Sequence, residues 1–361
     1  MNLDHQMMAR ALDLAAEGRR STSPNPMVGC VVVKEGKIIG TGWHERAGKP
    51  HAEVLAIEAA GEASRGATAY VNLEPCCHTG RTGPCTDVLI RAGVSRVVVA
   101  ISDPNPKVDG MGIQALRTEG IHVDVGVLAD EAESLNEKFL FAARTGLPFV
   151  LLKAGMTTDG KLATEGGRKQ WITSPPSLER SLLLREEYDA ILVGSGTVIA
   201  DDPRLTRRLG LNHAVTPWRR VVVDSSGEIP ADSHVFDRDA ETIVYVPNAS
   251  WYAGTAKNVA IVEVAGQNGR LDLREVLADL HRRGVGSVIA EGGAKLHTSL
   301  IEQELWRKVT LFVAPMFLGG AHSPSIFDRE VADLDQAYRF RFDSVERIGD
   351  DLQVTGYNDR A

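Results

Sequence analysis

The stretch EPCCHTGRTGPC, residues 74–85, holds three of the four cysteines of this 361-residue chain, beside a histidine. Thiolates and imidazoles are the ligands that zinc prefers, and cysteines clustered near histidine indicate metal binding more than a disulfide framework. A strand is expected just before the cluster, over 67–73, and a helix just after it, over 86–93, with Pro84 at the first helical position. The stretch therefore predicts a metal site between a strand and a helix.

A third ligand comes from PHAE, residues 50–53, where a helix is expected over 51–64. Catalytic zinc takes three protein ligands and keeps one position open for water. His51 and Glu53 are two positions apart, so both reach one site only if it abuts the helix N-terminus. This H-x-E motif followed by P-C is typical of zinc deaminases, in which the glutamate moves protons and binds no metal. We predict Glu53 as the catalytic residue and, as zinc ligands, His51, Cys76 and Cys85.

The spacing within the cluster departs from the usual P-C-x-x-C, because eight residues separate Cys76 from Cys85. This difference predicts an inserted loop between two ligands. Adjacent side chains seldom reach one ion without strain, so Cys76, which follows a proline, is taken as the ligand and Cys77 as a bystander. Cys30, inside an apolar strand, is expected in the core. A closed structural zinc site is the alternative, and the placement of Glu53 beside an open position argues against it.

Helices and strands alternate along the chain, as in a sheet covered by helices. A helix over 3–18 precedes a hairpin over 28–43 with its turn at Glu35-Gly36, and a helical pattern covers 129–145. The segment RTGLP, 144–148, is a boundary, which predicts domains 1–146 and 147–361. The second domain begins with an apolar strand over 149–156 and ends with a pair of strands within 338–357.

The charge balance excludes several classes of partner. The net charge of −8 provides no cationic field to attract nucleic acid or anionic lipid. No apolar run reaches a membrane-spanning length, and the first residues lack the basic-then-apolar order of a signal peptide. We therefore expect a cytoplasmic protein that binds small molecules, with no nucleic acid and no membrane among its partners.

A phosphate site is predicted in the second half. The stretch GSGTVI, 194–199, has Ile199 where a dinucleotide fingerprint needs a third glycine. Gly292-Gly293 lies between an expected strand and helix, where free backbone N–H groups can face an anion. A set of basic side chains precedes this glycine pair in the sequence, and they either line the pocket or form a solvated surface. They are Lys153, Lys161, Arg168, Lys169, Arg185, Arg204, Arg207 and Arg208.

The motifs GTGWHERAGKPHAE (40–53) and EPCCHTGRTGPC closely resemble those of the bifunctional riboflavin-biosynthesis deaminase–reductase family. That family usually has P-C-S-H-x-G-R-T-P-P-C, so the chain departs at Cys77 and Gly83. The resemblance implies an N-terminal cytidine-deaminase-like three-layer α/β domain followed by a dihydrofolate-reductase-like α/β domain. It also implies zinc-dependent deamination of 2,5-diamino-6-ribosylamino-4(3H)-pyrimidinone 5′-phosphate, then NADPH-dependent reduction of the ribosyl group to ribityl.

Residue roles follow from the same resemblance. The deaminase substrate would contact Asn25, His44, His78 and Arg81. NADPH would contact Met156, Trp171, Thr197, Asp201, Ser225, Gly293, Ala294, Lys295, Leu296, His297, Thr298 and Ser299. The reductase substrate would contact Lys169, Arg185, Leu205, Arg208 and Glu291. From the residues themselves, we expect Lys153, Asp201 or Glu291 to assist proton transfer in reduction, because each is a charged side chain at an otherwise small or apolar strand end. A homo-oligomer, dimer or tetramer, is also expected.

Two other functions stay open on the sequence. One is a nucleoside or RNA deaminase whose second half only binds nucleotides, although the acidic charge and few aromatics disfavour RNA. The other is a zinc-stabilised nucleotide-binding regulator without turnover. Release of ammonia from the pyrimidine substrate distinguishes the regulator from the enzyme.

Overall fold

The chain divides into two compact units between Gly146 and Leu147. The computed structural model describes residues 2–78, 83–165, 171–209, 217–252, 254, 258–267 and 269–360. Arg81 and Lys169, which the family resemblance assigns to substrate, lie outside the described residues. Across the described part of the chain, no helix is both long and apolar enough to cross a membrane.

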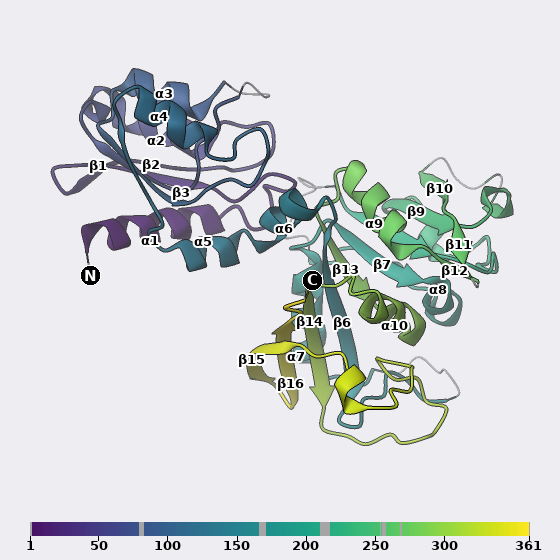
Figure 1. Ribbon diagram of the computed structural model, residues 1–361. Helices are drawn as coiled ribbons and strands as arrows, with labels where there is room; N and C mark the ends of the chain where they lie inside the picture. Colours follow the sequence, from purple (N-terminus) through teal and green to yellow (C-terminus); the bar gives the residue numbers. More distant parts are fainter. Residues whose placement is uncertain are drawn as a thin grey trace. The chain divides into compact units, whose positions relative to one another are not determined.

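The first unit is built on a five-stranded sheet in the order β2-β1-β3-β4-β5, of which Figure 1 labels β1, β2 and β3. Its strands are β1 (Gly29–Lys34), β2 (Lys37–Trp43), β3 (Thr68–Leu73), β4 (Arg96–Ile101) and β5 (His122–Val125). β1 pairs antiparallel with β2 and β3, whereas β3, β4 and β5 run parallel. The predicted hairpin is confirmed, because Glu35 and Gly36 both have positive φ, 52° and 74°, as tight two-residue turns require.

Helices cover both faces of this sheet and make three layers. α1 (Leu3–Ala16) and α5 (Ala129–Leu135) lie on one face, and α2 (Ala52–Ala60), α3 (Cys85–Ala92) and α4 (Met111–Thr118) lie on the other. β1, β3 and β4 are therefore buried almost throughout, as their apolar sequences predict. At Gly42 of β2 a Cβ atom would lie 2.4 Å from the carbonyl oxygen of Ala52, so glycine lets α2 approach the sheet closely.

Some boundaries differ from those expected. The helix predicted over 51–64 ends at Ala60 and continues as a short 3₁₀ helix, η1 (Gly61–Ser64). α3 begins at Cys85, so Pro84 caps the helix and does not occupy its first position. The helical pattern over 129–145 forms two helices, α5 and α6 (Glu137–Thr145), which meet at Asn136.

The second unit has a nine-stranded sheet in the order β10-β9-β8-β7-β13-β6-β14-β16-β15. All neighbours from β10 to β14 are parallel, and the predicted closing pair of strands is present and antiparallel. The strands are β6 (Phe149–Thr157), β7 (Ala190–Gly194), β8 (Arg219–Val223), β9 (Glu241–Val246), β10 (Val259–Glu263), β13 (Ser287–Glu291), β14 (Lys308–Ala314), β15 (Arg341–Ile348) and β16 (Asp351–Tyr357). A small ribbon, β11 (Gly266–Gln267) and β12 (Arg270–Leu271), was not expected.

The helices of the second unit are α7 (Pro175–Arg185), α8 (Ser195–Asp201), α9 (Leu273–Arg282) and α10 (Ala294–Glu302), with short 3₁₀ helices η2 (His234–Phe236), η3 (Ala249–Tyr252) and η4 (Leu334–Gln336). Apolar side chains of β6, β7 and β13 pack with those of α9 and α10 in one core. Because β7, β13, β6 and β14 are parallel neighbours, their carboxyl ends share one edge, where open α/β sheets bind ligands.

Candidate active sites

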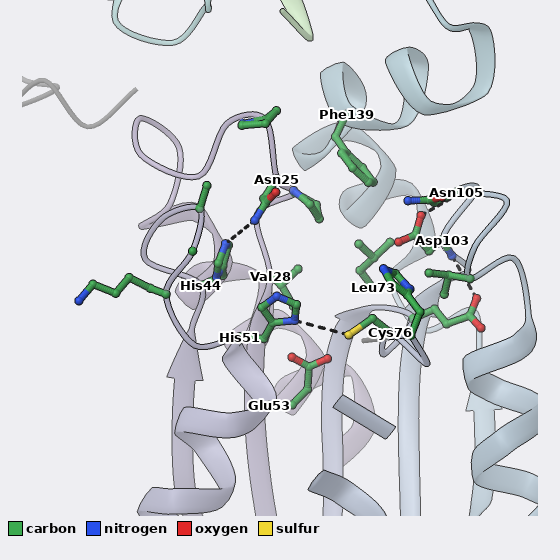
Figure 2. Close-up of a pocket in the computed structure, with 18 residues that line it drawn as sticks. Asn25, Val28, His44, His51, Glu53, Leu73, Cys76, Asp103, Asn105 and Phe139 are labelled. Carbon is green, nitrogen blue, oxygen red and sulfur yellow. Dashed lines mark hydrogen bonds between the residues drawn. The ribbon is translucent and has the colours of Figure 1, made fainter. Parts of the chain in front are cut away.

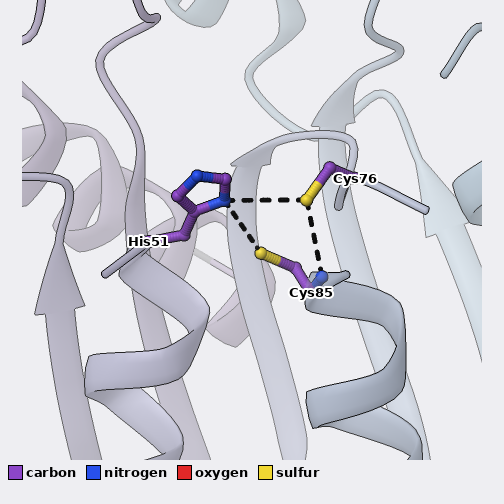
Figure 3. A group of neighbouring side chains, drawn as sticks. All are labelled: His51, Cys76 and Cys85. Atoms are coloured by element: carbon purple, nitrogen blue, oxygen red, sulfur yellow. Dashed lines mark hydrogen bonds between the residues drawn. The ribbon is translucent and has the colours of Figure 1, made fainter. Parts of the chain in front are cut away.

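The structure brings His51, Cys76 and Cys85 together at one end of the first sheet (Figure 3). His51 Nδ1 lies 3.1 Å from Cys85 Sγ and 3.6 Å from Cys76 Sγ. Bond lengths of about 2.0–2.3 Å place the ligand atoms of tetrahedral zinc roughly 3.6 Å apart. The three side chains therefore fit one zinc ion, although they come from three separate segments of the chain.

Local structure explains how each side chain reaches the site. His51 is the N-cap of α2, Cys76 follows β3, and Cys85 is the first residue of α3. Two helix N-termini thus point at the cluster, where their positive ends stabilise thiolates. Hydrogen bonds from the Cys85 thiol and from His51 lower the pKa of Cys76 to about 4. Cys77 is not part of the group, since its Sγ lies 3.7 Å from the carbonyl oxygen of Lys107.

Glu53 lies in the first turn of α2 and is only 3% exposed. Burial raises the pKa of its carboxyl, and the charge on Cys76 adds to the rise. Its Oε2 is buried and has no hydrogen-bond partner among the described residues. A buried acceptor without a partner is costly, which indicates that a ligand or water completes this position.

The cluster opens into a cavity of about 420 Å³ (Figure 2). Of the four residues assigned to the deaminase substrate, Asn25, His44 and His78 line it. His44 Nδ1 lies 3.1 Å from the carbonyl oxygen of Pro50, so Nδ1 carries the proton and donates. His44 Nε2 then accepts from Asn25 Nδ2 at 3.0 Å, and burial lowers the pKa of this imidazole. The amide oxygen of Asn25 is thereby left for other donors.

The cavity also has lining residues that the sequence reasoning missed, among them Asp103, Asn105 and Phe139. Asp103 and Asn105 follow β4, and burial raises the pKa of the Asp103 carboxyl to about 6. Polar residues directly after a buried parallel strand were a usable signal for these two. Phe139 lies on α6, far along the chain from either motif, and nothing in its local sequence marks it.

A second group of side chains lies at the carboxyl end of β13 in the second unit. Arg185 donates to both carboxylate oxygens of Glu291 at 2.8 Å, and Lys153 Nζ lies 3.5 Å from Glu291 Oε2. Lys153 and Glu291 are register partners on β6 and β13. The two cations hold the pKa of Glu291 at about 2 despite its burial, whereas burial lowers the pKa of Lys153.

Gly292 and Gly293 link β13 to α10 with positive φ values of 79° and 84°. A Cβ at Gly293 would lie 3.2 Å from Thr197 Oγ1, so this turn and the first turn of α8 are close neighbours. Leu296, His297 and Thr298 are buried, whereas Lys295 is exposed, so the helix start offers backbone N–H groups and the Lys295 ammonium as donors.

The remaining predicted cofactor and substrate residues are more dispersed. Met156 lies near the end of β6, Asp201 ends α8, and Ser225 follows β8, which β7 separates from β13. Trp171 is 68% exposed, and Arg208 is exposed as well. Leu205 is only 3% exposed, so its side chain packs inside the unit.

Comparisons with known proteins cover almost the whole chain. Residues 1–101 match the cytidine and deoxycytidylate deaminase zinc-binding region, and residues 148–354 match the RibD C-terminal domain. The riboflavin biosynthesis protein RibD of Aquifex aeolicus is 42% identical over 98% of both chains, and that of Escherichia coli is 40% identical over 97% of this chain and 98% of its own. Acinetobacter baumannii RibD has a similar structure, with a TM-score of 0.91 and 36% identity over 98% of both chains. The structure of a Thermotoga maritima diaminohydroxyphosphoribosylaminopyrimidine deaminase/5-amino-6-(5-phosphoribosylamino)uracil reductase is also similar. Its TM-score is 0.87, and its sequence is 35% identical over 99% of both chains.

A buried carboxylate beside a His–Cys–Cys cluster on a three-layer domain defines a zinc-dependent deaminase, here joined to a reductase domain. The chain belongs to the RibD family of bifunctional deaminase–reductases of riboflavin biosynthesis. Its first domain carries the zinc-binding region of the cytidine and deoxycytidylate deaminases, and its second domain is the RibD C-terminal domain. The expected fold class and family resemblance are both confirmed.

Proposed function

We propose that residues 1–146 deaminate 2,5-diamino-6-ribosylamino-4(3H)-pyrimidinone 5′-phosphate and that residues 147–361 then reduce its ribosyl group. The two compact units and the separate family matches support this division. The observation that carries the deaminase assignment is the unpartnered Oε2 of buried Glu53 beside the His51, Cys76 and Cys85 group.

In the deaminase, His51, Cys76 and Cys85 would hold zinc. Bound zinc supplies Lewis-acid activation of water, which brings the pKa of that water close to neutrality. Glu53 takes a proton from the attacking water and delivers it to the ring nitrogen beside the reacting carbon. It then takes the proton of the added hydroxyl group and gives it to the departing amine, so that a carbonyl and ammonia form. The raised pKa of Glu53 suits a group that must both accept and donate near neutral pH. Asn25, His44, His78 and Arg81 would bind the substrate.

In the reductase, the start of α10 and its neighbours would bind NADPH, whose nicotinamide supplies the hydride for carbon 1 of the ribose. The C1–O bond opens as the hydride arrives, so the ring oxygen must receive a proton. Glu291 is a poor donor because Arg185 and Lys153 keep it ionised. Lys153, whose ammonium is destabilised by burial, is the better donor, and we propose it over Asp201 and Glu291.

The other substrate and cofactor residues assigned by family resemblance remain part of this proposal. We also propose a homo-oligomer, for which β15 offers a surface: it is the edge strand of its sheet, and Phe342 and Val345 are exposed on it. A cytoplasmic location would keep the thiol ligands reduced.

The test is to incubate the purified chain with the diaminopyrimidinone phosphate, with and without NADPH, and to identify both products by mass. We expect replacement of an amine by oxygen without NADPH, and a further two hydrogens with it. Glu53→Gln should lower the deamination rate by about 10²–10⁴-fold and leave the reduction rate unchanged. Lys153→Met should lower the reduction rate and leave the deamination rate unchanged. Stoichiometric zinc without ammonia release would favour the regulator, and turnover of RNA in place of the free pyrimidine would favour the RNA deaminase.

A further inference from the structure

Helix α6 supplies a wall of the deaminase pocket that lies outside both zinc motifs. Phe139 of α6 lines the same cavity as His51, Glu53 and Asn25. In Figure 2 its ring projects toward the cavity from the side opposite Glu53. The half-buried side chain packs against the apolar core of this unit and also lines the cavity.

Asn136, directly before α6, fixes the place of this wall. Its Oδ1 accepts from the backbone N–H of Met27 at 2.8 Å, and its Nδ2 donates to the carbonyl oxygen of Met27 at 2.9 Å. Asn136 is 1% exposed, so water cannot replace these bonds, and each is costly to break. Its backbone also ends α5 and starts α6, through Asn136 N–H to Ala132 O and Leu140 N–H to Asn136 O.

These bonds join two walls of one cavity. Met27 is two residues from Asn25, which lines the pocket, and Asn136 is three residues, almost one helical turn, from Phe139. Met27 is held from a second side as well, since buried Asn72 donates to its carbonyl oxygen at 3.0 Å. The positions of the Asn25 amide and the Phe139 ring are therefore coupled through one buried amide.

The chemistry of the lining indicates what the ring contacts. Asn25 and His44 provide polar groups on one side of the cavity, and Asp103 and Asn105 provide them on another. Among the described lining residues, Phe139 is the one phenyl ring. A pyrimidine has polar edges and two apolar faces, and aromatic side chains bind such faces by stacking.

We propose that Phe139 packs against a ring face of the pyrimidine substrate and that Asn136 is a positioning residue that holds Phe139 and Asn25 at a matched separation. This inference rests on the proposed deaminase function. It adds a substrate contact and a positioning residue from the segment between the zinc motifs and the reductase domain.

The experiment measures deamination and reduction separately for the full chain and for Phe139→Leu, Phe139→Tyr, Asn136→Asp and the double variant Phe139→Leu/Asn136→Asp. Phe139→Leu should raise the KM for deamination about tenfold and change kcat much less, since it removes binding to a face that does not react. Phe139→Tyr keeps the ring and should restore the KM. Asn136→Asp loses the N–H donor to the Met27 carbonyl oxygen and should also raise the KM. In the double variant, the fold-increase in KM should be smaller than the product of the two single-variant increases.

Phe141→Leu is the matched control, because Phe141 is on the same helix and is not among the residues that line the cavity. Bound zinc and the reduction rate should stay at wild-type levels in every variant. An unchanged KM in Phe139→Leu, or an equal rise in Phe141→Leu, overturns the inference. If Phe139→Leu loses zinc, the Phe139→Tyr variant decides the question, provided that it retains zinc. A raised KM for deamination in Phe139→Tyr would then overturn the inference, and a wild-type KM would support it. Absence of deamination by the wild-type chain would reject the proposed function itself, which is a distinguishable result.

Discussion

Cys76 and Cys77 show how differently two adjacent cysteines can be placed. The Cys76 thiol receives a hydrogen bond from the backbone N–H of Cys85 at 3.4 Å and lies beside His51. The Cys77 thiol points to the carbonyl oxygen of Lys107, and burial raises its pKa. Cys76 Sγ therefore lies within the group that can hold a metal ion, whereas Cys77 Sγ faces a backbone carbonyl outside that group.

Serine substitutions at these two positions form a matched pair. Cys76→Ser should lose most of the bound zinc and at least about 100-fold of the deamination rate, because serine is a poor zinc ligand. Cys77→Ser should keep one zinc per chain and near-wild-type deamination, because a hydroxyl can donate to Lys107 as the thiol does. Zinc content by atomic absorption and ammonia release provide the two readouts. Loss of zinc from the Cys77→Ser variant would indicate instead that Cys77 is a zinc ligand.

The part of the site that was predictable consists of residues whose chemistry is rare and whose spacing is short. His51, Glu53, Cys76 and Cys85 fall in two motifs, and zinc chemistry explains each of them. Phe139 was not predictable, because a phenylalanine in an amphipathic helix is usually a core residue and only the tertiary path of α6 brings it to the cavity. Asn136 was missed for a similar reason, since its hydrogen bonds span 109 positions.

At the scale of elements, α10 is anchored by a buried histidine. His297 is fully buried, and its Nε2 donates to the carbonyl oxygen of Ala290 at 3.2 Å, next to Glu291. Burial lowers the pKa of this imidazole from 6.5 to about 4. The folded protein therefore holds His297 neutral at a pH where the unfolded chain would protonate it.

This shift predicts an acid sensitivity of the second unit. The pKa of His297 is lower in the folded protein than in the unfolded chain. The stabilising contribution of His297 to folding is therefore fully present above pH 6.5 and is lost as the pH falls toward about 4. Replacing His297 with Gln, which keeps an N–H donor and does not titrate, should remove up to roughly 1.4 kcal/mol per pH unit of that loss. Urea unfolding followed by tryptophan fluorescence suits the measurement, because four of the five tryptophans are in residues 147–361.

Exposed His322 provides the control for this pH dependence. His322→Gln, which changes an exposed side chain, should show the same loss of stability as the wild type between pH 6.5 and about 4, the two pKa values of His297. Equal acid sensitivity of His297→Gln and wild type would show that His297 does not titrate as its burial implies.

Element types were more predictable than element ends. The strands β1, β3, β4 and β13 are largely apolar in sequence, which is typical of strands covered on both faces of a sheet. The break at Asn136 was not predictable, because apolar spacing continues across it and its cause is a tertiary contact with Met27. β10 was missed as well, since its residues are only half-buried and carry a weaker pattern.

At the scale of the whole molecule, the two candidate sites lie in separate parts of the chain. The metal-binding group and Glu53 lie within residues 51–85, and the Lys153, Arg185 and Glu291 cluster lies in the second unit. Each unit has its own sheet and its own apolar cores. The loss of one site should therefore leave the other intact.

Zinc removal tests this independence. Dialysis of the full chain against a zinc chelator should abolish ammonia release, because three protein ligands without metal leave Glu53 no activated water to deprotonate. NADPH-dependent reduction of the deaminated substrate, supplied directly, should continue at the wild-type rate, and added zinc should restore deamination. Dialysis without chelator is the control. A parallel fall in reduction, reversed by zinc, would mean that the metal also stabilises the reductase domain, and the assignment of separate activities to residues 1–146 and 147–361 would then fail.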